Sequence, residues 1–512
     1  MLATSRQRAL LFVSLASAFA TSVASAQELR VEGSWRLRFS DNTDQTLDDT
    51  GTKLGQGSWF EHRIRLTPKV VADDVWEVQA SADVLSGTLG GDLARDFSGL
   101  GWTGRSIQDG YKASSFDLRT IYGTVKFPFG QLQFGQRPSQ WGMGLVANSG
   151  NDETNLDFGD ARFGDLVDGV LFATKPLVPL MGPQSDFARQ VVTAFAFDAV
   201  YRDRFASLVV RDSNGLHWQD LAWQGVAAAL WDPSDKTRIG FYTARRVQSF
   251  GNDGGNLHIW VFDLHARHAM VFEGINSTLS LEGEGAFING ATSHLTNLNA
   301  LSSTKVQQSG AAGRARLAMP LGLEAEVESG FASGDGNPFD GNAANFTSSR
   351  DYKVGLVLFD EVLQFQTQNA ARRLSDPNLV GRPPSGIDLL PTEGALTNVI
   401  YLKPTIRWRP AMLENKLRVT GSLLYAVAPE PYVDAYQSFV ASAARNPFGA
   451  EAKNGYGTEL AAAVSYNDKF GRLGVEAGAQ YGVLFPGDAF NRADGTSMPK
   501  VAVFKLRAGV SF

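Results

Sequence analysis

Apolar and polar residues alternate through most of the chain, beginning near residue 29. In the first such run Leu29, Val31 and Trp35 share one face, while Arg36 and Arg38 lie on the other. A period of two is the spacing of side chains on a β-strand, whose successive residues point to opposite sides. The same alternation recurs in the ranges 60–66, 76–84, 279–287, 311–319, 323–331, 400–409 and 504–512.

The polar faces of these runs favour a membrane barrel over a soluble β-sandwich, which also alternates but buries its apolar face. Here the polar faces carry ionised groups at nearly every alternate position, and strands of about 10–13 residues match a tilted membrane-crossing strand. In lipid such strands must close into a cylinder, because unpaired backbone amides find no water there. The predicted fold is therefore all-β, a transmembrane antiparallel β-barrel of about 18 strands.

Short and long connections alternate between the strands, as short periplasmic turns and long extracellular loops do in outer-membrane barrels. The segment Tyr352–Val362 also looks strand-like, but counting it would give an odd number and invert every later strand. We therefore expect it to lie inside one long extracellular loop, 332–398. The strands are expected to begin near residues 29, 59, 75, 115, 131, 167, 190, 219, 237, 256, 275, 306, 321, 399, 416, 456, 473 and 500.

Composition excludes several other classes of protein. The chain has 47 Lys and Arg against 53 Asp and Glu, a formal charge of −6, which argues against a general nucleic-acid binder. It has no Cys, which excludes disulfide scaffolds, thiolate metal sites and thiol nucleophiles. A mean hydropathy of −0.14, with no long apolar run after residue 26, excludes a helical membrane protein.

The first 26 residues have the pattern of a cleaved secretory signal. Arg6 and Arg8 precede an apolar stretch, 9–20, that is too short to span a bilayer. Ala24-Ser25-Ala26 then supplies the small residues that a signal peptidase needs. We predict that residues 1–26 are a signal peptide and that 27–512 form the barrel.

Several short segments resemble known outer-membrane proteins. The last ten residues, Val503–Phe512, resemble the C-terminal strand of Gram-negative outer-membrane proteins, whose final Phe is read by the barrel-assembly machinery. Gly130–Arg137 resembles a porin hairpin. The segments that resemble the alginate-export family of 18-stranded barrels are Ala332–Asp340, Asn345-Phe346, Gly457–Leu460, Tyr466 and Phe485–Phe490.

This resemblance implies an outer-membrane channel, a porin or exporter-like pore, for passive movement of small or anionic polymeric solutes such as sugars or uronates. The expected partners are outer-membrane lipid and lipopolysaccharide, the barrel-assembly machinery, and a small-molecule or polysaccharide solute. No nucleic acid and no cofactor is expected. The oligomeric state stays open, because porins are commonly trimeric and the alginate-export family is usually monomeric. The alternative is a structural or adhesive barrel without an open channel.

The charged positions on the polar faces are expected to line the lumen. One wall is basic, and the opposite wall carries glutamates that arginines on neighbouring strands partly neutralise. The basic wall predicts a modest preference for anions, although the same charges could simply brace a water-filled bore. The predicted pore-lining residues are Arg36, Arg38, Arg63, Arg65, Arg119, Arg137, Glu282, Glu284, Arg314, Arg316, Glu324, Glu326, Glu328, Arg407, Arg409, Arg418, Lys505 and Arg507, and the predicted assembly signal is Phe512.

Three smaller clusters have alternative interpretations. Acidic residues between 152 and 168, Asp157 and Asp165 among them, could bend into the bore as a constriction or be solvated. Asp335, Asn337 and Asp340 have a spacing that suits Ca²⁺, but a turn explains the same residues. The six His show no acid–base–nucleophile arrangement, so we predict no enzymatic site.

Overall fold

The structure is a computed structural model, and it describes most of the chain after the proposed signal peptide. Residues 1–26 lie outside the described part, so their cleavage stays a prediction. The described residues are 27–43, 46–51, 58–72, 75–91, 116–151, 157–158, 161, 164–203, 206, 209–212, 215–218, 220–250, 255–293, 303–337, 339–374, 378–380 and 391–512.

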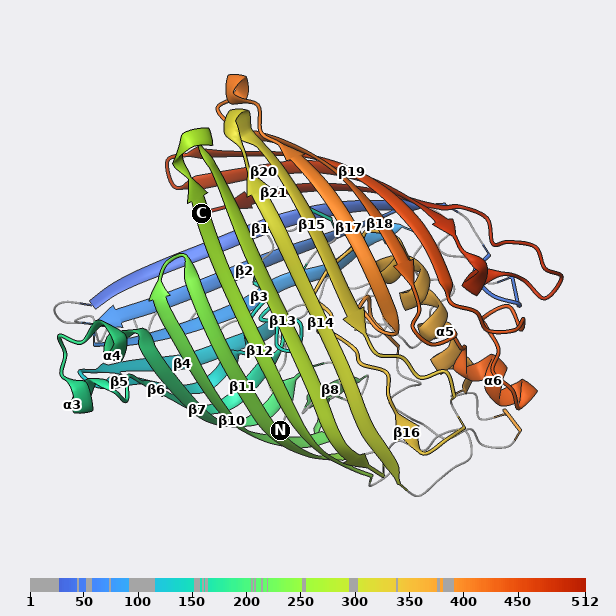
Figure 1. Cartoon of the computed structure of the whole chain (residues 1–512), viewed down its shortest axis with the longest axis horizontal. Helices are drawn as coiled ribbons and strands as arrows, with labels where there is room; N and C mark the ends of the chain where they lie inside the picture. Colours follow the sequence, from blue (N-terminus) through green and yellow to red (C-terminus); the bar gives the residue numbers. More distant parts are fainter. Residues whose placement is uncertain are drawn as a thin grey trace.

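Eighteen antiparallel strands form one closed barrel (Figure 1). Each strand pairs with its neighbours in the chain, and every predicted strand start lies within two residues of an observed one. The barrel strands are β1 (Gln27–Asn42), β2 (Ser58–Ala72), β3 (Trp76–Gly91), β4 (Asp117–Phe127), β5 (Gly130–Pro138), β6 (Leu166–Thr174), β7 (Val191–Arg202), β10 (Asp220–Ser234), β11 (Thr237–Phe250), β12 (Asn256–Phe272), β13 (Ser277–Thr292), β14 (Thr304–Ala318), β15 (Leu323–Ala332), β17 (Val399–Trp408), β18 (Leu417–Val427), β19 (Gly455–Phe470), β20 (Leu473–Pro486) and β21 (Val501–Ser511).

The barrel closes where the first strand meets the last. Ser34–Asn42 of β1 pairs antiparallel with Val503–Ser511 of β21. Beyond this ladder the Gly33 amide donates to the Phe512 carbonyl at 2.9 Å, and the Phe512 amide donates back to the Gly33 carbonyl at 3.0 Å. The C-terminal residue is therefore part of the seam, and the sheet has no free edge.

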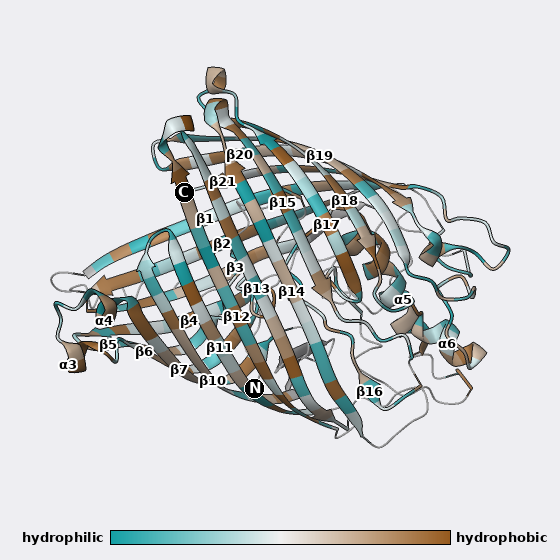
Figure 2. Ribbon diagram, in the orientation of Figure 1, coloured by the Kyte–Doolittle hydropathy of each residue, from teal (hydrophilic) through white to brown (hydrophobic). Residues whose placement is uncertain are grey.

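The alternation of the sequence separates an apolar outside from a charged inside. Along β17 the odd-numbered residues are buried and the even-numbered ones exposed, so Ile406 is 60% exposed while Arg407 is 5% exposed. Figure 2 shows the resulting mixture of hydrophilic and hydrophobic residues along single strands. Six aromatic residues lie exposed near strand ends at the short-turn end of the barrel: Trp76, Phe127, Phe129, Trp231, Trp408 and Phe512.

The short connections contain single helical turns, and the long ones contain most of the remaining structure. Among the described residues, no helix is long and apolar enough to cross a membrane. The helices are α3 (Val178–Met181), α4 (Asp186–Gln190), α5 (Gln364–Leu374), α6 (Ala435–Ala441), a π-helical turn (Leu358–Leu363) and 3-10 turns at Glu273–Ile275, Pro320–Gly322, Ala411–Leu413 and Asp488–Phe490. The non-barrel strands are β8 (Val209–Asp212), β9 (Gly215–Trp218) and β16 (Asn342–Ala343).

The ambiguous segment Tyr352–Val362 is not a barrel strand. It belongs to the connection between β15 and β17, as its placement in a long loop predicts, but it is partly helical because the π-helical turn begins at Leu358. Its alternating apolar residues are buried on all sides rather than on one: Leu356, Val357, Leu358 and Phe359 are at most 1% exposed. A strand-like pattern here reflects burial inside the barrel.

The substitution Gly33→Val tests how much the seam between β1 and β21 contributes to the stability of the barrel. A Cβ at this position would lie 2.3 Å from the Phe512 ring, so Gly33→Val displaces that ring from the strand it covers. We expect a loss of about 1 kcal/mol of stability at the seam and a smaller heat-modifiable, folded fraction on gels. Gly225→Val on β10 is the matched control, because a Cβ there meets nothing within 4 Å. Equal folded fractions for the two variants would contradict this role.

Candidate functional site

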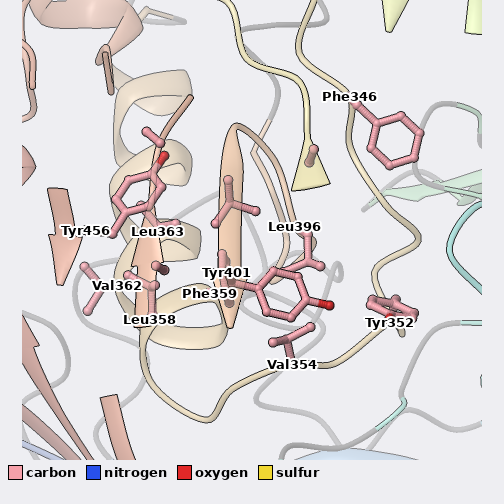
Figure 3. Packing of buried hydrophobic residues seen from close by; sticks show 14 of the residues in the cluster. Phe346, Tyr352, Val354, Leu358, Phe359, Val362, Leu363, Leu396, Tyr401 and Tyr456 are labelled. Atoms are coloured by element: carbon pink, nitrogen blue, oxygen red, sulfur yellow. The ribbon is translucent and has the colours of Figure 1, made fainter. Parts of the chain in front are cut away.

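Two loops fold into the lumen from the long-loop end. They are the β5–β6 loop, of which residues 139–151, 157–158, 161 and 164–165 are described, and the β15–β17 loop, of which residues 333–337, 339–374, 378–380 and 391–398 are described. Their apolar side chains join inward-facing strand residues in one buried cluster, part of which Figure 3 shows around Tyr352, Phe359 and Tyr401. The barrel therefore has a packed interior at this end.

Acidic residues of the barrel wall hold the β5–β6 loop. The Trp141 indole N–H donates to Asp263 of β12 at 2.9 Å, and its ring packs 5.4 Å from that of Tyr242. The carboxylate of Glu284 on β13 accepts the backbone N–H groups of Met143 and Leu145, the latter at 3.0 Å. Glu284, a predicted pore-lining residue, therefore binds a loop rather than facing open water.

Glu459 of β19 holds the β15–β17 loop in the same way. Its carboxylate accepts three consecutive backbone N–H groups, from Leu356 at 2.7 Å, Val357 at 3.1 Å and Leu358 at 2.8 Å. These amides open the π-helical turn, where no backbone partner is available to them. Glu459 is 2% exposed, so the three hydrogen bonds compensate for the burial of its charge.

Two further carboxylates complete the attachment of the β15–β17 loop. Glu328 of β15 accepts the hydroxyls of Tyr352 at 3.1 Å and Tyr401 at 2.8 Å. Glu361 of the loop pairs with Lys505 of β21 at 2.6 Å and accepts the Asn42 amide of β1 at 3.0 Å. Lys505, a predicted pore-lining residue of the basic wall, thus also anchors this loop.

The two loops also bind each other. Ser349 N–H donates to the Leu145 carbonyl at 2.8 Å, and Gly164 N–H donates to Asp351 at 2.6 Å. Asp165 lies at this junction, where its carboxylate accepts the Asn148 N–H at 2.9 Å and the Ser349 hydroxyl at 3.3 Å. Desolvation, assisted by Asp203, raises the pKa of Asp165 to about 7.

The centre of the basic wall is an arginine bound by carboxylates from two directions. Arg407 of β17 contacts Glu324 at 2.6 Å and Glu326 at 2.8 Å on β15, and Asp157 of the β5–β6 loop at 2.5 Å. Burial works to raise the pKa of Asp157, but the hydrogen bonds and charge of Arg407 outweigh it and hold that pKa below its usual value. Asp157, from the acidic cluster, does bend into the bore.

The remaining predicted lumen residues form pairs along the wall. Arg316 contacts Glu324 and Glu326, and Glu282 contacts Arg314 and His265. Arg119 and Arg63 are buried, and Arg409 is half-buried. The other pairs are Arg36 and Arg507 with Glu476 (3.5 and 3.7 Å), Arg38 with Glu61 (4.0 Å), Arg65 with Asp83 (2.8 Å), Arg137 with Asp198 (2.8 Å) and Arg418 with Asp157 (3.7 Å).

A crevice and a larger cavity lie beside the described parts of these loops. A crevice of about 20 Å³ lies against the basic wall, between Asp157 and the strand cations Arg38, Arg418, Lys505 and Arg507. A larger cavity of about 490 Å³ begins at the short turn of Asp235 and Lys236. Its inner end is formed by Asp351, Tyr352 and Lys353 of the β15–β17 loop, and its walls by Arg267, Glu282, Arg314 and Glu328, among others.

The possible calcium ligands are used in turns instead. Asp335 accepts the backbone N–H groups of Asn337 and Ala344, and Asp340 accepts that of Asn342. Within the described ranges no group of three or more His, Asp or Glu is arranged to hold a metal ion. The turn interpretation explains these residues.

Comparison with known proteins places this geometry in a known fold. No protein-family model matches the chain, and no curated protein does. Solved structures match over almost the whole length. OccAB1 of Acinetobacter baumannii has a TM-score of 0.53 at 9% identity, covering 94% of this chain and 96% of its own. OccK9 (OpdG) of Pseudomonas aeruginosa has a TM-score of 0.55 at 12% identity, covering 95% and 98%.

The chain has the fold of an outer-membrane porin. The similar structures are porins of the Occ/OprD type, so the expected Gram-negative porin architecture is confirmed. The finer resemblance to the alginate-export family is not confirmed by these matches.

Glu459→Gln tests the attachment of the β15–β17 loop. A glutamine has one acceptor oxygen and would turn its NH₂ toward backbone donors, leaving amides unpaired at a cost of about 1–3 kcal/mol. We expect hydrogen exchange at Leu356–Leu358 to speed up accordingly, by mass spectrometry. Glu476→Gln, which alters an inward carboxylate paired only with strand arginines, should leave these amides protected. Unchanged exchange in Glu459→Gln would refute the anchoring role.

The raised pKa of Asp165 predicts that the stability of the junction between the two loops depends on pH. Its pKa in the folded protein, about 7, lies above the ordinary value of 3.8, so the folded state holds a proton there that the unfolded state releases. The contribution of protonated Asp165 to the free energy of unfolding is therefore lost as pH rises from about 4 to 7. Amide protection at Gly164 and Ser349, corrected for intrinsic exchange, should fall over that window. Asp165→Asn should flatten the profile, while Asp168→Asn on β6 should not.

Proposed function

We propose that the protein is an outer-membrane channel for passive movement of small anionic solutes, with carboxylated sugars such as uronates as the expected class. The proposal depends on one observation. A strip of cations runs along the inside of the barrel across the seam, and the crevice left by the inward loops lies directly against it. We call this set the basic strip: Arg36 and Arg38 on β1, Arg418 on β18, and Lys505 and Arg507 on β21.

The wall around the crevice leaves room beside these long side chains. Of its inward residues on β19 and β20, Ala463, Ser465 and Gly478 are small, and the longer Gln480 donates to the Asp157 carbonyl at 3.1 Å. Four cations of the strip line this space with one carboxylate, Asp157. The other carboxylates that pair with the strip, Glu61, Glu361 and Glu476, are not part of this lining. A narrow passage lined mostly by one sign of charge raises the local concentration of the opposite ion and favours its passage.

The opposite wall of the barrel does not form a second, cation-selective path. Its glutamates are compensated locally, because Glu282, Glu324 and Glu326 all contact arginines. The larger cavity at the short-turn end has four cationic and four acidic residues in its lining: Lys236, Arg267, Arg314 and Lys353 against Asp235, Glu282, Glu328 and Asp351. Such a lining suits a polar, hydroxyl-rich solute that carries few charges of its own.

The inward loops favour small solutes over a polymer. A polyuronate exporter of the alginate-export type would use the same cations, but a polymer needs a continuous wide bore. The β15–β17 loop fills that bore and is held by Glu328, Glu459 and Lys505. A single small solute requires much less displacement of the loop.

One observation favours a second candidate, a structural or adhesive barrel without channel activity. The crevice beside the basic strip has a volume of only about 20 Å³, close to that of one water molecule. A crevice of this size passes a hydrated ion only if the loops beside it move.

Planar-bilayer recording in a salt gradient tests the channel proposal. The wild-type protein should conduct with a reversal potential that indicates anion preference. Arg418→Glu combined with Arg507→Glu should lower the anion-to-cation permeability ratio by roughly threefold or more, because the field at the crevice reverses. Arg189→Glu on α4, an exposed charge at the short-turn end, is the control.

Four outcomes separate the candidates. Block by galacturonate at millimolar concentration supports the solute class, whereas block by a polyuronate alone favours export. An unchanged reversal potential in the double variant would show that the basic strip does not select ions. Absence of conductance from correctly folded protein would favour the structural role.

A further inference from the structure

A row of polar residues crosses the outer surface of β11–β14, four strands that lie side by side on one wall (Figure 1). Strand register aligns Arg245 with Trp260, Trp260 with Asn289, and Asn289 with Gln307. The next row toward the long loops aligns Val247, His258, Ala291 and Lys305. All these residues face away from the lumen, because their strand neighbours Arg246, Ile259, Ile288 and Val306 are buried.

The apolar rows below locate this polar group relative to the membrane. Three successive outward rows contain no charged residue. They are Thr243, Phe262, Phe287 and Ser309, then Phe241, Leu264, Gly285 and Ala311, then Ile239, Ala266, Gly283 and Gly313. A second polar pair follows, in which the Thr237 hydroxyl lies 2.8 Å from His268 Nδ1.

The spacing of the two polar rows matches the thickness of a membrane. Arg245 and Thr237 are eight residues apart on β11, which is about 27 Å along a strand and about 20 Å along the normal at a tilt near 40°. Porins expose an apolar band about 25 Å tall. The Arg245 row therefore lies at the extracellular boundary of the hydrocarbon, at the level of the outer-leaflet headgroups.

The cations in this patch have no acidic partner within the described part of the chain. No ion pair is formed by Arg245, His258 or Lys305, and the guanidinium of Arg245 instead lies 5.5 Å from the centre of the Trp260 ring. That stacking holds the cation near the strand surface without neutralising it. The amides of Asn289 and Gln307 are exposed beside it and supply neutral hydrogen-bond donors.

A ligand for this patch must combine three properties. It must carry anionic groups for Arg245 and Lys305, hydroxyl or amide groups for Asn289 and Gln307, and acyl chains that cover the apolar rows below. A phosphorylated, acylated sugar has all three, whereas a free phosphate lacks the chains and a phospholipid lacks the sugar ring. Arginine and lysine side chains near a membrane surface attract lipid phosphates by about 1 kcal/mol each.

We propose that the outer face of β11–β14 is a binding site for a phosphorylated glycolipid of the outer leaflet, with the two phosphates of lipid A against Arg245 and Lys305. This site is separate from the lumen. It rests on the outer-membrane location of the barrel but not on its conduction of solutes.

Native mass spectrometry of the detergent-solubilised full chain tests the site, with lipid A, monophosphoryl lipid A and phosphatidylglycerol as probes. Arg245→Gln combined with Lys305→Gln should weaken lipid A binding by about tenfold or more. The matched control is Lys500→Gln, which removes another cation stacked on an aromatic ring, 4.8 Å from that of Phe485. Arg245→Lys, which keeps the charge, should stay within about threefold of the wild type.

The readouts separate this site from the channel. Heat-modifiable gel mobility shows that each variant is folded, and bilayer conductance should be unchanged in all of them. Tighter binding of lipid A than of phosphatidylglycerol, lost only in the double variant, supports the proposal. Equal binding of the two lipids by wild type, or full lipid A affinity in the folded double variant, would overturn it.

Discussion

The absence of water in the hydrocarbon is the constraint on which the rest of this structure depends. A backbone N–H or C=O exposed to lipid has no partner, so every strand must be paired along both edges. The chain meets this requirement by bringing Val503–Phe512 back to Gly33–Asn42, and the final residue exchanges two hydrogen bonds with Gly33. Alternating side chains, a charged interior and a lipid-facing exterior all follow from that closed ladder.

The closed barrel also encloses loops. The backbone N–H and C=O groups of these loops are buried in the lumen and need hydrogen-bond partners of their own. Carboxylates of the wall supply such partners. Glu284 accepts two backbone amides of one loop and Glu459 accepts three consecutive amides of the other, so irregular segments are paired without strand or helix partners. Charged residues of the wall therefore have two roles. Some position the loops, and others, such as Arg38 and Arg507, line the space that the loops leave.

The sequence predicts the barrel well because alternation is a local property that each strand carries by itself. It predicts the interior poorly, since the decisive contacts join residues far apart in the chain. Asp157 and Arg407 are 250 positions apart, and Leu356 and Glu459 are 103 apart. The acidic run around Asp157 indicated a constriction but not its partner. Nothing near Glu361 signals that Lys505 and Asn42 bind it. Arg245 and Lys305 are 60 positions apart on different strands, and only the register shows that they share one surface.

Glu361 has a consequence for how the molecule is made. It is bound by Asn42 from the first strand and by Lys505 from the last, and these strands are neighbours only once the cylinder is complete. One carboxylate of an internal loop therefore connects the first and the last strand of the barrel. The full set of contacts at Glu361 can therefore exist only after β1 and β21 have met, so the position of this loop reports whether the cylinder is complete.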